Sequence, residues 1–175
     1  MVVQQLFERT AAAEELSAGH VDTTVRRLLL DTGGGALVLP SEVGAGVSQI
    51  MPVVVAALEA RAGLSLVEQP EIHVHPAVQV GLGDLFIHAA TRDGVRKTMI
   101  VETHSEHLIL RLLRRIRETT ENELSGGAPP FSADKLSVLY VEGHPEGVRI
   151  RRLRVEVRGE FLDPWPGGFF AGRLA

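Results

Sequence analysis

The chain has 175 residues, of which 45% are hydrophobic and 23% charged, and its formal net charge at pH 7 is −4. That length and composition fit one folded domain or part of one, and the negative charge argues against a surface wholly committed to nucleic acid. The sequence has no cysteine, which excludes disulfides and thiolate metal sites, and no apolar run of the ~20 residues that a membrane-spanning helix needs, so no membrane contact is expected.

Residues 1–35 are predicted to be the helical remnant of an upstream region. Residues 2–16 place a few apolar side chains among charged and polar neighbours, and residues 16–19 are typical of a helix end. Because this apolar stripe is thin, the helix needs a partner element to cover it. The first residues lack the basic segment of a signal peptide, so we expect a cytoplasmic protein.

A short strand at 36–39 is followed by a loop of glycines and hydroxyls and then by an apolar helix at 50–62. Ser48 is the predicted N-cap of this helix. The loop residues that could contact a ligand are Ser41, Gly44, Gly46, Ser48 and Gln49. A loop of this kind suits an anion, because unpaired N–H groups and the positive end of the helix dipole point at the ligand.

Two apolar strands are predicted, at 64–68 and 98–102, and each is followed by a helix. The first strand ends at Glu68, and the second runs into His104. Because the carboxyl ends of neighbouring parallel strands meet at one edge of a sheet, we expect these polar tips to share one site.

Helices are predicted at 77–91 and from a capping box at 103–106, because apolar side chains recur at helical spacing. The second helix and the C-terminal region carry many arginines, namely Arg111, Arg114, Arg115, Arg117, Arg149, Arg151, Arg152, Arg154 and Arg158. Such a set could hold DNA phosphates, although arginine runs are more often solvated faces balanced by acids.

A loop rich in glycine and proline is expected at 125–134, and residues 135–175 are predicted to form a β-rich C-terminal extension with strands at 135–141 and 147–157. The tail holds the only tryptophan and three phenylalanines, so it is expected to pack. Residues 124–127 match most of an ABC-transporter signature motif. The prolines that follow prevent the helix that this motif requires, so we interpret the match as chance.

The polar strand tips suggest a site for a magnesium-bound nucleotide. Glu68 offers a hard carboxylate oxygen of the kind that Mg²⁺ prefers beside phosphates. Gln69 could orient an attacking water but cannot accept its proton, so hydrolysis should be slow without another base. His104 could donate a hydrogen bond to a γ-phosphate, and Glu102 could be a second base or the partner that fixes the tautomer of His104.

Two other classes of function stay open. One is a metal-dependent hydrolase or nuclease, since carboxylates and imidazoles suit zinc or manganese. Its candidate ligands are His73, His75, Glu102 and His104, with Glu71 and His107. Against it, prolines bracket the first two histidines, and the spacing matches no specific ligand motif. The other class is a non-catalytic fragment that serves only for interaction.

Four segments together resemble the ABC-like ATPases of the RecF and overcoming-lysogenization-defect (OLD) nuclease group. LSLVEQPEIHVHP looks like their Walker B and D-loop region, and IVETHSEHLILRLLRRI like their sensor-histidine strand and the following helix. PSEVGAGVSQIMPVV is similar to their signature loop, and GEFLDPWPGGFF to an uncharacterised C-terminal domain in one bacterial branch of this AAA-type group. The ordered succession of four motifs is more specific than any one of them.

The resemblance implies an α/β fold: the partial sheet of an ABC-like P-loop NTPase, three-layered with flanking helices, plus a small β-rich extension. Residues 36–124 would be the C-terminal half of the ATPase domain. Glu68 takes the place of the Walker B aspartate that binds Mg²⁺, Gln69 that of the catalytic glutamate, and His104 the sensor position. The signature-loop residues would contact ATP held by a second subunit, and they are Ser41, Gly44, Gly46, Ser48 and Gln49.

The Walker A pattern G-x-x-x-x-G-K-[ST] occurs nowhere in the sequence, and residues 31–35 have no lysine to reach the phosphates. On its own the chain should therefore bind ATP weakly or not at all. We expect a C-terminal portion that needs an N-terminal half or a P-loop-bearing partner to supply this loop. The expected partner is a second copy of the chain or that P-loop-bearing protein. ATP hydrolysis would act as a conformational switch and, by family analogy, serve DNA repair or phage defence.

Overall fold

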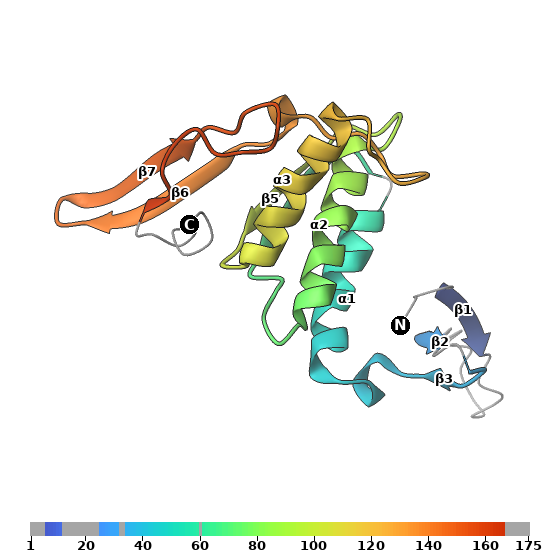
Figure 1. Cartoon of the computed structure of the whole chain (residues 1–175). Coiled ribbons are helices and arrows are strands. Elements are labelled where there is room, and N and C mark those ends of the chain that lie inside the picture. The colour runs from blue at the N-terminus through green and yellow to red at the C-terminus, as the bar shows by residue number, and fades with distance from the viewer. Residues whose placement is uncertain (1–5, 12–24, 32–33, 60, 167–175) are drawn as a thin grey trace.

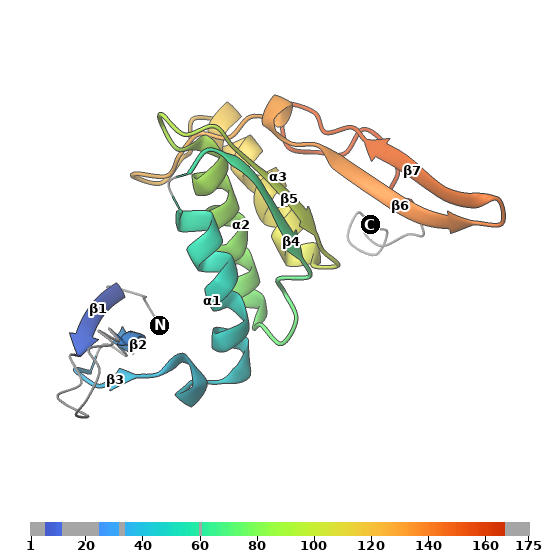
Figure 2. The same ribbon diagram turned by 180° about the vertical axis from the view of Figure 1, so that it is seen from behind.

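The computed structural model of the chain describes residues 6–11, 25–31, 34–59 and 61–166. Within these ranges it contains three small β-sheets, three α-helices and two 3₁₀ turns. The helices form the middle of the molecule, with an antiparallel N-terminal sheet towards one end and a C-terminal β-hairpin towards the other (Figures 1 and 2).

The central unit is a pair of parallel strands covered on one face by helices (Figure 2). The strands are β4 (Gly63–Glu68) and β5 (Lys97–Glu102), and the helices are α1 (Ala45–Leu58), α2 (Pro76–Thr91) and α3 (Glu106–Thr120). Buried side chains from both layers meet in one core, which joins Val67, Leu82, Phe86 and Leu108. The predicted strands at 64–68 and 98–102 and the predicted helix at 77–91 are confirmed.

The other face of this sheet is open in the described chain. Leu64 and Leu66 of β4 are 60% and 72% exposed, and Ile100 of β5 is 53% exposed. Glu68 and Glu102 lie on this same face, because side chains alternate along a strand. Parallel sheets normally bury both faces. The described residues thus form two layers where three were predicted, and the third layer stays a prediction.

The N-terminal segment forms strands where a helix was predicted. β1 (Leu6–Ala11) pairs antiparallel with β2 (Val25–Asp31), which also pairs with β3 (Leu37–Val38). The predicted helix over 2–16 is wrong for residues 6–11, and its other residues lie outside the described ones. The ladder with β2 satisfies the backbone of this stretch, whereas a helix with so thin an apolar stripe would have lacked cover.

The third predicted helix is confirmed, but its start differs. α3 begins at Glu106, and its N-cap is Ser105, whose hydroxyl oxygen accepts a hydrogen bond from the backbone N–H of Leu108 at 3.0 Å. Thr103, which the capping box placed at this position, lies outside the helix and binds the loop after β4 instead. The cap of α3 is therefore local, whereas Thr103 makes a contact with a segment distant in sequence.

The C-terminal extension is a hairpin followed by a segment that packs against α3. β6 (Val138–His144) and β7 (Gly147–Leu153) pair antiparallel, and a 3₁₀ turn at 133–135 delays β6 beyond its predicted start. Trp165 contacts Tyr140 and Phe161 edge to face, with ring centroids 6.1 and 5.3 Å away. This confirms that the tail packs, while its residues 167–175 lie outside the described ones.

Arg154 and Asp163 fasten the tail to the end of β7. The Arg154 guanidinium donates to the Asp163 carboxylate at 2.8 Å, its backbone N–H donates at 2.7 Å, and this hydrogen bonding lowers the pKa of Asp163 to about 2. The pKa of Asp163 in the folded protein lies below its ordinary value of 3.8. The ion pair therefore stabilises the fold fully at pH values above 3.8, and this stabilisation is lost as the pH falls through about 2. We expect carboxyl NMR titration to give a pKa near 2 in the wild type and a clear rise towards 3.8 in Arg154→Ala; an unchanged pKa in the variant would contradict this assignment.

Candidate functional site

Glu68 and Glu102 lie opposite each other at the carboxyl ends of β4 and β5. They are partners in the parallel register, and the backbone N–H of Gln69 extends the ladder by donating to the carbonyl of Glu102 at 2.8 Å. Both glutamates are exposed, and within the described residues neither carboxylate has a hydrogen bond or ion pair. His104 follows at the same edge and is also exposed. The prediction that these two strand tips are neighbours is confirmed; the roles of their side chains stay predictions.

Glu71 ties the loop after β4 to the tip of β5. Its two carboxylate oxygens accept hydrogen bonds from the backbone N–H of His104 at 2.5 Å and from the hydroxyl of Thr103 at 2.8 Å. The turn that brings Glu71 there holds Gln69 and His73 at φ of 44° and 58°, a left-handed conformation that is uncommon outside glycine. Glu71 thus fixes the backbone of His104.

This role of Glu71 was not predicted from the sequence, where the residue was only a candidate metal ligand. Glu102 was predicted to be either a second base or the partner of His104, and no hydrogen bond joins the Glu102 and His104 side chains in the part of the chain that the structure describes. The sequence signal that could have indicated this role is a carboxylate placed just after one strand. Such a carboxylate can reach the hydroxyl and N–H groups that follow the neighbouring strand.

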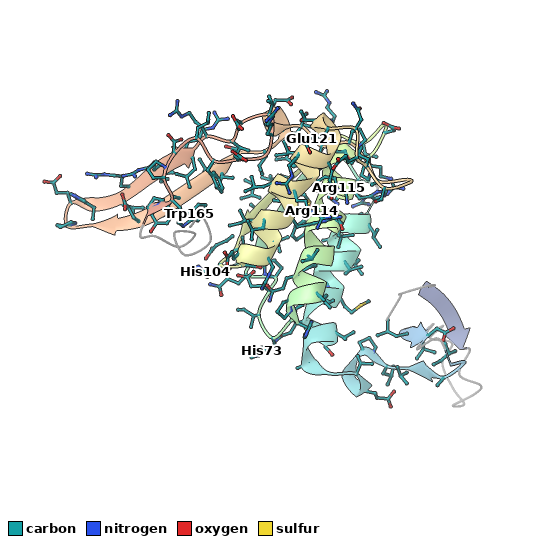
Figure 3. The ribbon with its side chains drawn as sticks, viewed as in Figure 1. His73, His104, Arg114, Arg115, Glu121 and Trp165 are labelled. Atoms are coloured by element: carbon teal, nitrogen blue, oxygen red, sulfur yellow. The ribbon has the colours of Figure 1, made fainter. Side chains whose placement is uncertain are left out.

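A second set of hydrogen bonds holds the same loop from the helical side. The Ser105 hydroxyl donates to the side-chain oxygen of Gln79 at 2.6 Å, and the Gln79 amide nitrogen donates to the carbonyl of Val74 at 2.8 Å. Figure 3 shows His73 and His104 towards the same end of the helical layer. The loop after β4 and the starts of α2 and α3 are therefore joined beside His104.

The predicted signature loop precedes and includes the start of α1. The helix begins at Ala45 with Gly44 as N-cap, earlier than the predicted residue 50, and no side chain caps its first turn. Ser48 is therefore not the N-cap; its hydroxyl donates to the carbonyl of Pro40 in the preceding 3₁₀ turn. Ser41, Gly44 and Gln49 are exposed, so an anion could reach this helix N-terminus.

Gly46 brings the start of α1 against the loop after β4. A Cβ atom at this position would lie 2.4 Å from the carbonyl oxygen of His73, closer than real Cβ contacts allow. The two predicted site segments are thus in contact within one chain.

Gly46→Ala is expected to lower the free energy of unfolding by about 1–3 kcal/mol, because the His73 backbone must move to admit the methyl group. The matched control is Gly81→Ala in α2, where a Cβ meets nothing within 4 Å. That variant should gain up to about 1 kcal/mol from helix propensity. Urea unfolding of both variants measures the difference, and equal changes would show that the contact at Gly46 has no effect.

The metal-site alternative is not supported by the arrangement of its residues. Within the described part of the chain, no group of three or more histidine and carboxylate side chains could hold a metal ion. His75 is the N-cap of α2, where its Nδ1 accepts from the N–H of Ala77 at 3.2 Å, and Glu71 is engaged by Thr103 and His104. His73 lies in a turn with φ of 58°, so the two histidines are not on one extended segment.

Many of the arginines considered for DNA contact are paired with acids. On α3, Arg111 and Arg115 bind Asp84, and Arg114 binds Glu118. In the extension, Arg154 binds Asp163, and Arg151 lies 3.8 Å from Glu142. DNA contact stays a prediction, and these ion pairs reduce the positive charge available for it.

A family model described as "AAA domain, putative AbiEii toxin, Type IV TA system" matches residues 6–111. The chain belongs to this AAA-domain family. The match supports a nucleotide-binding, ATPase-type function and a P-loop NTPase-like α/β fold. No curated protein and no solved structure is matched by the chain. The closer relation to the RecF and OLD group stays a prediction.

This AAA domain fits one part of an ATP site and lacks another. Two unpaired carboxylates at adjacent strand tips are hard oxygen donors of the kind that Mg²⁺ uses, often one or two at a time beside phosphates and water. The uncapped N-terminus of α1 suits an anion. The lysine-bearing loop that grips the β- and γ-phosphates has no counterpart in the sequence. Among the described helices, none is both long and apolar enough to cross a membrane.

Proposed function

We propose that the chain supplies the carboxylate, sensor and signature-loop part of a composite ATP site, and that an N-terminal half or a P-loop-bearing partner supplies its phosphate-binding loop. The observation that carries this proposal is the pair of unpartnered carboxylates, Glu68 and Glu102, beside a His104 whose backbone Glu71 fixes. The family match supports the binding of a nucleotide, and the roles of these residues toward that nucleotide are our inference.

The open face of the β4–β5 sheet favours an assembly in which a further layer of protein covers that face. Three large apolar side chains are more than half exposed on the face that ends in the two glutamates. Burying a leucine or isoleucine side chain fully contributes about 1.5–3 kcal/mol, so covering this face would stabilise an assembly considerably. A segment laid on this face would lie directly next to the glutamates.

The residues of this chain would act on the bound nucleotide in distinct ways. Glu68 would hold the magnesium ion, and Gln69, whose backbone continues the ladder with Glu102, would orient the attacking water. His104 would donate a hydrogen bond to the terminal phosphate. Mg²⁺, when bound, neutralises negative charge on the phosphates. Because an amide cannot accept a proton, we expect slow hydrolysis suited to a switch, with Glu102 as the available base.

The start of α1 would serve a second nucleotide site. Gly44, Gly46 and Ser48 lie at a helix N-terminus that no side chain caps, with exposed Ser41 and Gln49 beside it. In a dimer this end of the helix would face the phosphates held by the other subunit. A homodimer alone would not supply a P-loop, so the assembly would need a P-loop-bearing half on each side. A link to DNA repair or phage defence rests on family analogy.

The test is to supply the missing loop. The chain is coexpressed with the N-terminal half of another protein of this AAA family that carries G-x-x-x-x-G-K-[ST], and ATP turnover of the purified complex is measured. We expect no turnover by the chain alone, turnover by the complex, and loss of it when the Walker A lysine is replaced by alanine. A complex that forms but turns over no ATP would favour the non-catalytic interaction fragment, and failure to form any complex would contradict the composite site.

A further inference from the structure

A cavity of about 480 Å³ lies between α2 and the turn that follows α3. Its lining includes Gly81, Asp84 and His88 of α2, Arg115 of α3, and Gly126 and Gly127 of the turn. It is a surface cavity that is largely open to solvent. Figure 3 places Arg115 well along α3 from His104, and ten residues of helix correspond to about 15 Å. The cavity is therefore separate from the proposed ATP site.

Arg115 is the unusual residue of this cavity, because it is a buried charge with unused donors. It is 4% exposed, and its Nη2 donates to Asp84 at 2.6 Å. Its Nη1 is buried and has no hydrogen-bond partner. Its Nε lies 3.4 Å from Glu118, an ion-pair distance, but likewise makes no hydrogen bond. Leaving a buried charged donor unpaired is costly, and native proteins rarely do so without a ligand, ion or water.

Arg115 shares its acidic partners with neighbouring arginines. Asp84 is shared by Arg111 and Arg115, and Glu118 lies within 3.6 Å of Arg111, Arg114 and Arg115. Neither carboxylate is therefore committed to Arg115 alone. A buried charge with few partners of its own is stabilised by a further counter-charge in contact with it.

The turn at Gly126 and Gly127 leaves its backbone open. A Cβ atom at either glycine would meet nothing within 4 Å, and Gly127 has φ of +80°, which favours glycine. The turn is closed by the N–H of Ala128, which donates to the carbonyl of Ser125 at 3.0 Å. Residues 124–127 resemble a signature motif, but residues 128–132, which follow them, are not helical. Gly126 and Gly127 are both exposed, so an oxygen in the cavity could accept from their backbone N–H groups.

We propose that this cavity binds a small molecule through an oxyanion group, a phosphate or a carboxylate, held by Arg115 and the Gly126–Gly127 turn. An oxyanion in the cavity would be a counter-ion beside the Arg115 guanidinium, which lines the cavity and whose Nη1 has no hydrogen-bond partner. Gly81 keeps the cavity open from the α2 side, because no side chain occupies the space above its backbone.

The test is an NMR titration of the full chain with sodium phosphate and, separately, sodium acetate, with sodium chloride keeping the ionic strength constant. We expect saturable shifts of the Arg115 Nε–H signal and of the Gly126 and Gly127 amides with at least one of the two anions. The anion that saturates at lower concentration identifies the headgroup. Arg114, whose side chain is 63% exposed on the same helix, should show no saturable shift.

Two variants separate binding from folding. Arg115→Gln should weaken the anion at least tenfold, and Gly81→Leu, which retains Arg115 but fills the cavity, should abolish the saturable shifts. Gly81→Ala is the matched control and should bind within twofold of wild type, since one methyl leaves most of the space open. If Arg115→Gln does not fold, the anion titration of Gly81→Leu alone tests whether the cavity binds the anion. The absence of saturation by both anions in the wild type, or equal binding in Gly81→Leu, would overturn the proposal and leave a protein partner's carboxylate as the better explanation of Arg115.

Discussion

Glu68→Gln is expected to lower ATP turnover by the completed enzyme about 100-fold or more. The glutamine oxygen is neutral and is a poorer ligand for Mg²⁺ than a carboxylate. In the isolated chain the same change should raise the free energy of unfolding by about 0.3 kcal/mol, because it removes repulsion between two carboxylates that face each other in the register. Turnover and stability should thus move in opposite directions, which a loss of folding cannot produce.

The matched control is Glu121→Gln, at the far end of α3 from His104 (Figure 3). ATP turnover of this variant should stay within about twofold of the wild-type value, because a substitution at an exposed surface position has little effect on the fold. Glu102→Gln should lower turnover less than Glu68→Gln if Glu68 holds the metal ion. Unchanged turnover in Glu68→Gln, or a larger loss in Glu102→Gln, would contradict the role assigned to Glu68.

The central unit could be predicted from sequence because its signals are local. Apolar runs that stop at polar tips marked β4 and β5, and apolar residues at helical spacing marked α2 and α3. The chain twice shows a strand, a polar tip and then a helix, and this order implied two neighbouring parallel strands. The carboxyl ends of these strands lie side by side, with Glu68 opposite Glu102. Here the local and the tertiary preferences agree.

The contacts between distant segments could not be predicted in the same way. Glu71 reaches His104 only because the left-handed backbone at Gln69 and His73 turns the loop back, and no propensity scale marks that conformation. Residues 6–11 form a strand because β2 pairs with them, which overrides a helix-like spacing. Ser48 lies inside α1, where its hydroxyl binds the carbonyl of Pro40, eight residues earlier, rather than capping the helix.

α3 connects the candidate site to the C-terminal extension. Its N-cap is Ser105, next to His104, and its Ile109 and Leu113 form a core with Val155, Phe161 and Trp165 of the extension. The Thr120 hydroxyl donates to the carbonyl of Val157 at 2.6 Å near the other end of the helix. The candidate site and the extension are therefore packed against the same helix.

The tightest point of this packing is Gly159. It has φ of +72°, and a Cβ atom there would lie 2.0 Å from the carbonyl oxygen of Leu113 in α3. The glycine lies in the turn between Val155 and Phe161, which form an isolated bridge. Only a residue without a side chain lets this turn approach the helix backbone so closely.

Gly159→Ala is expected to lower the free energy of unfolding by about 3 kcal/mol, the sum of left-handed strain and a backbone clash. The tail should separate from α3, and Trp165, the only tryptophan, should report this as a change in fluorescence before global unfolding in urea. Gly94→Ala is the matched control, because Gly94 has φ of +73° but no atom within 4 Å of its Cβ position. It should lose only about 1 kcal/mol and keep the wild-type fluorescence. Equal losses in the two variants would mean that the contact with Leu113 does not hold the extension on the helix.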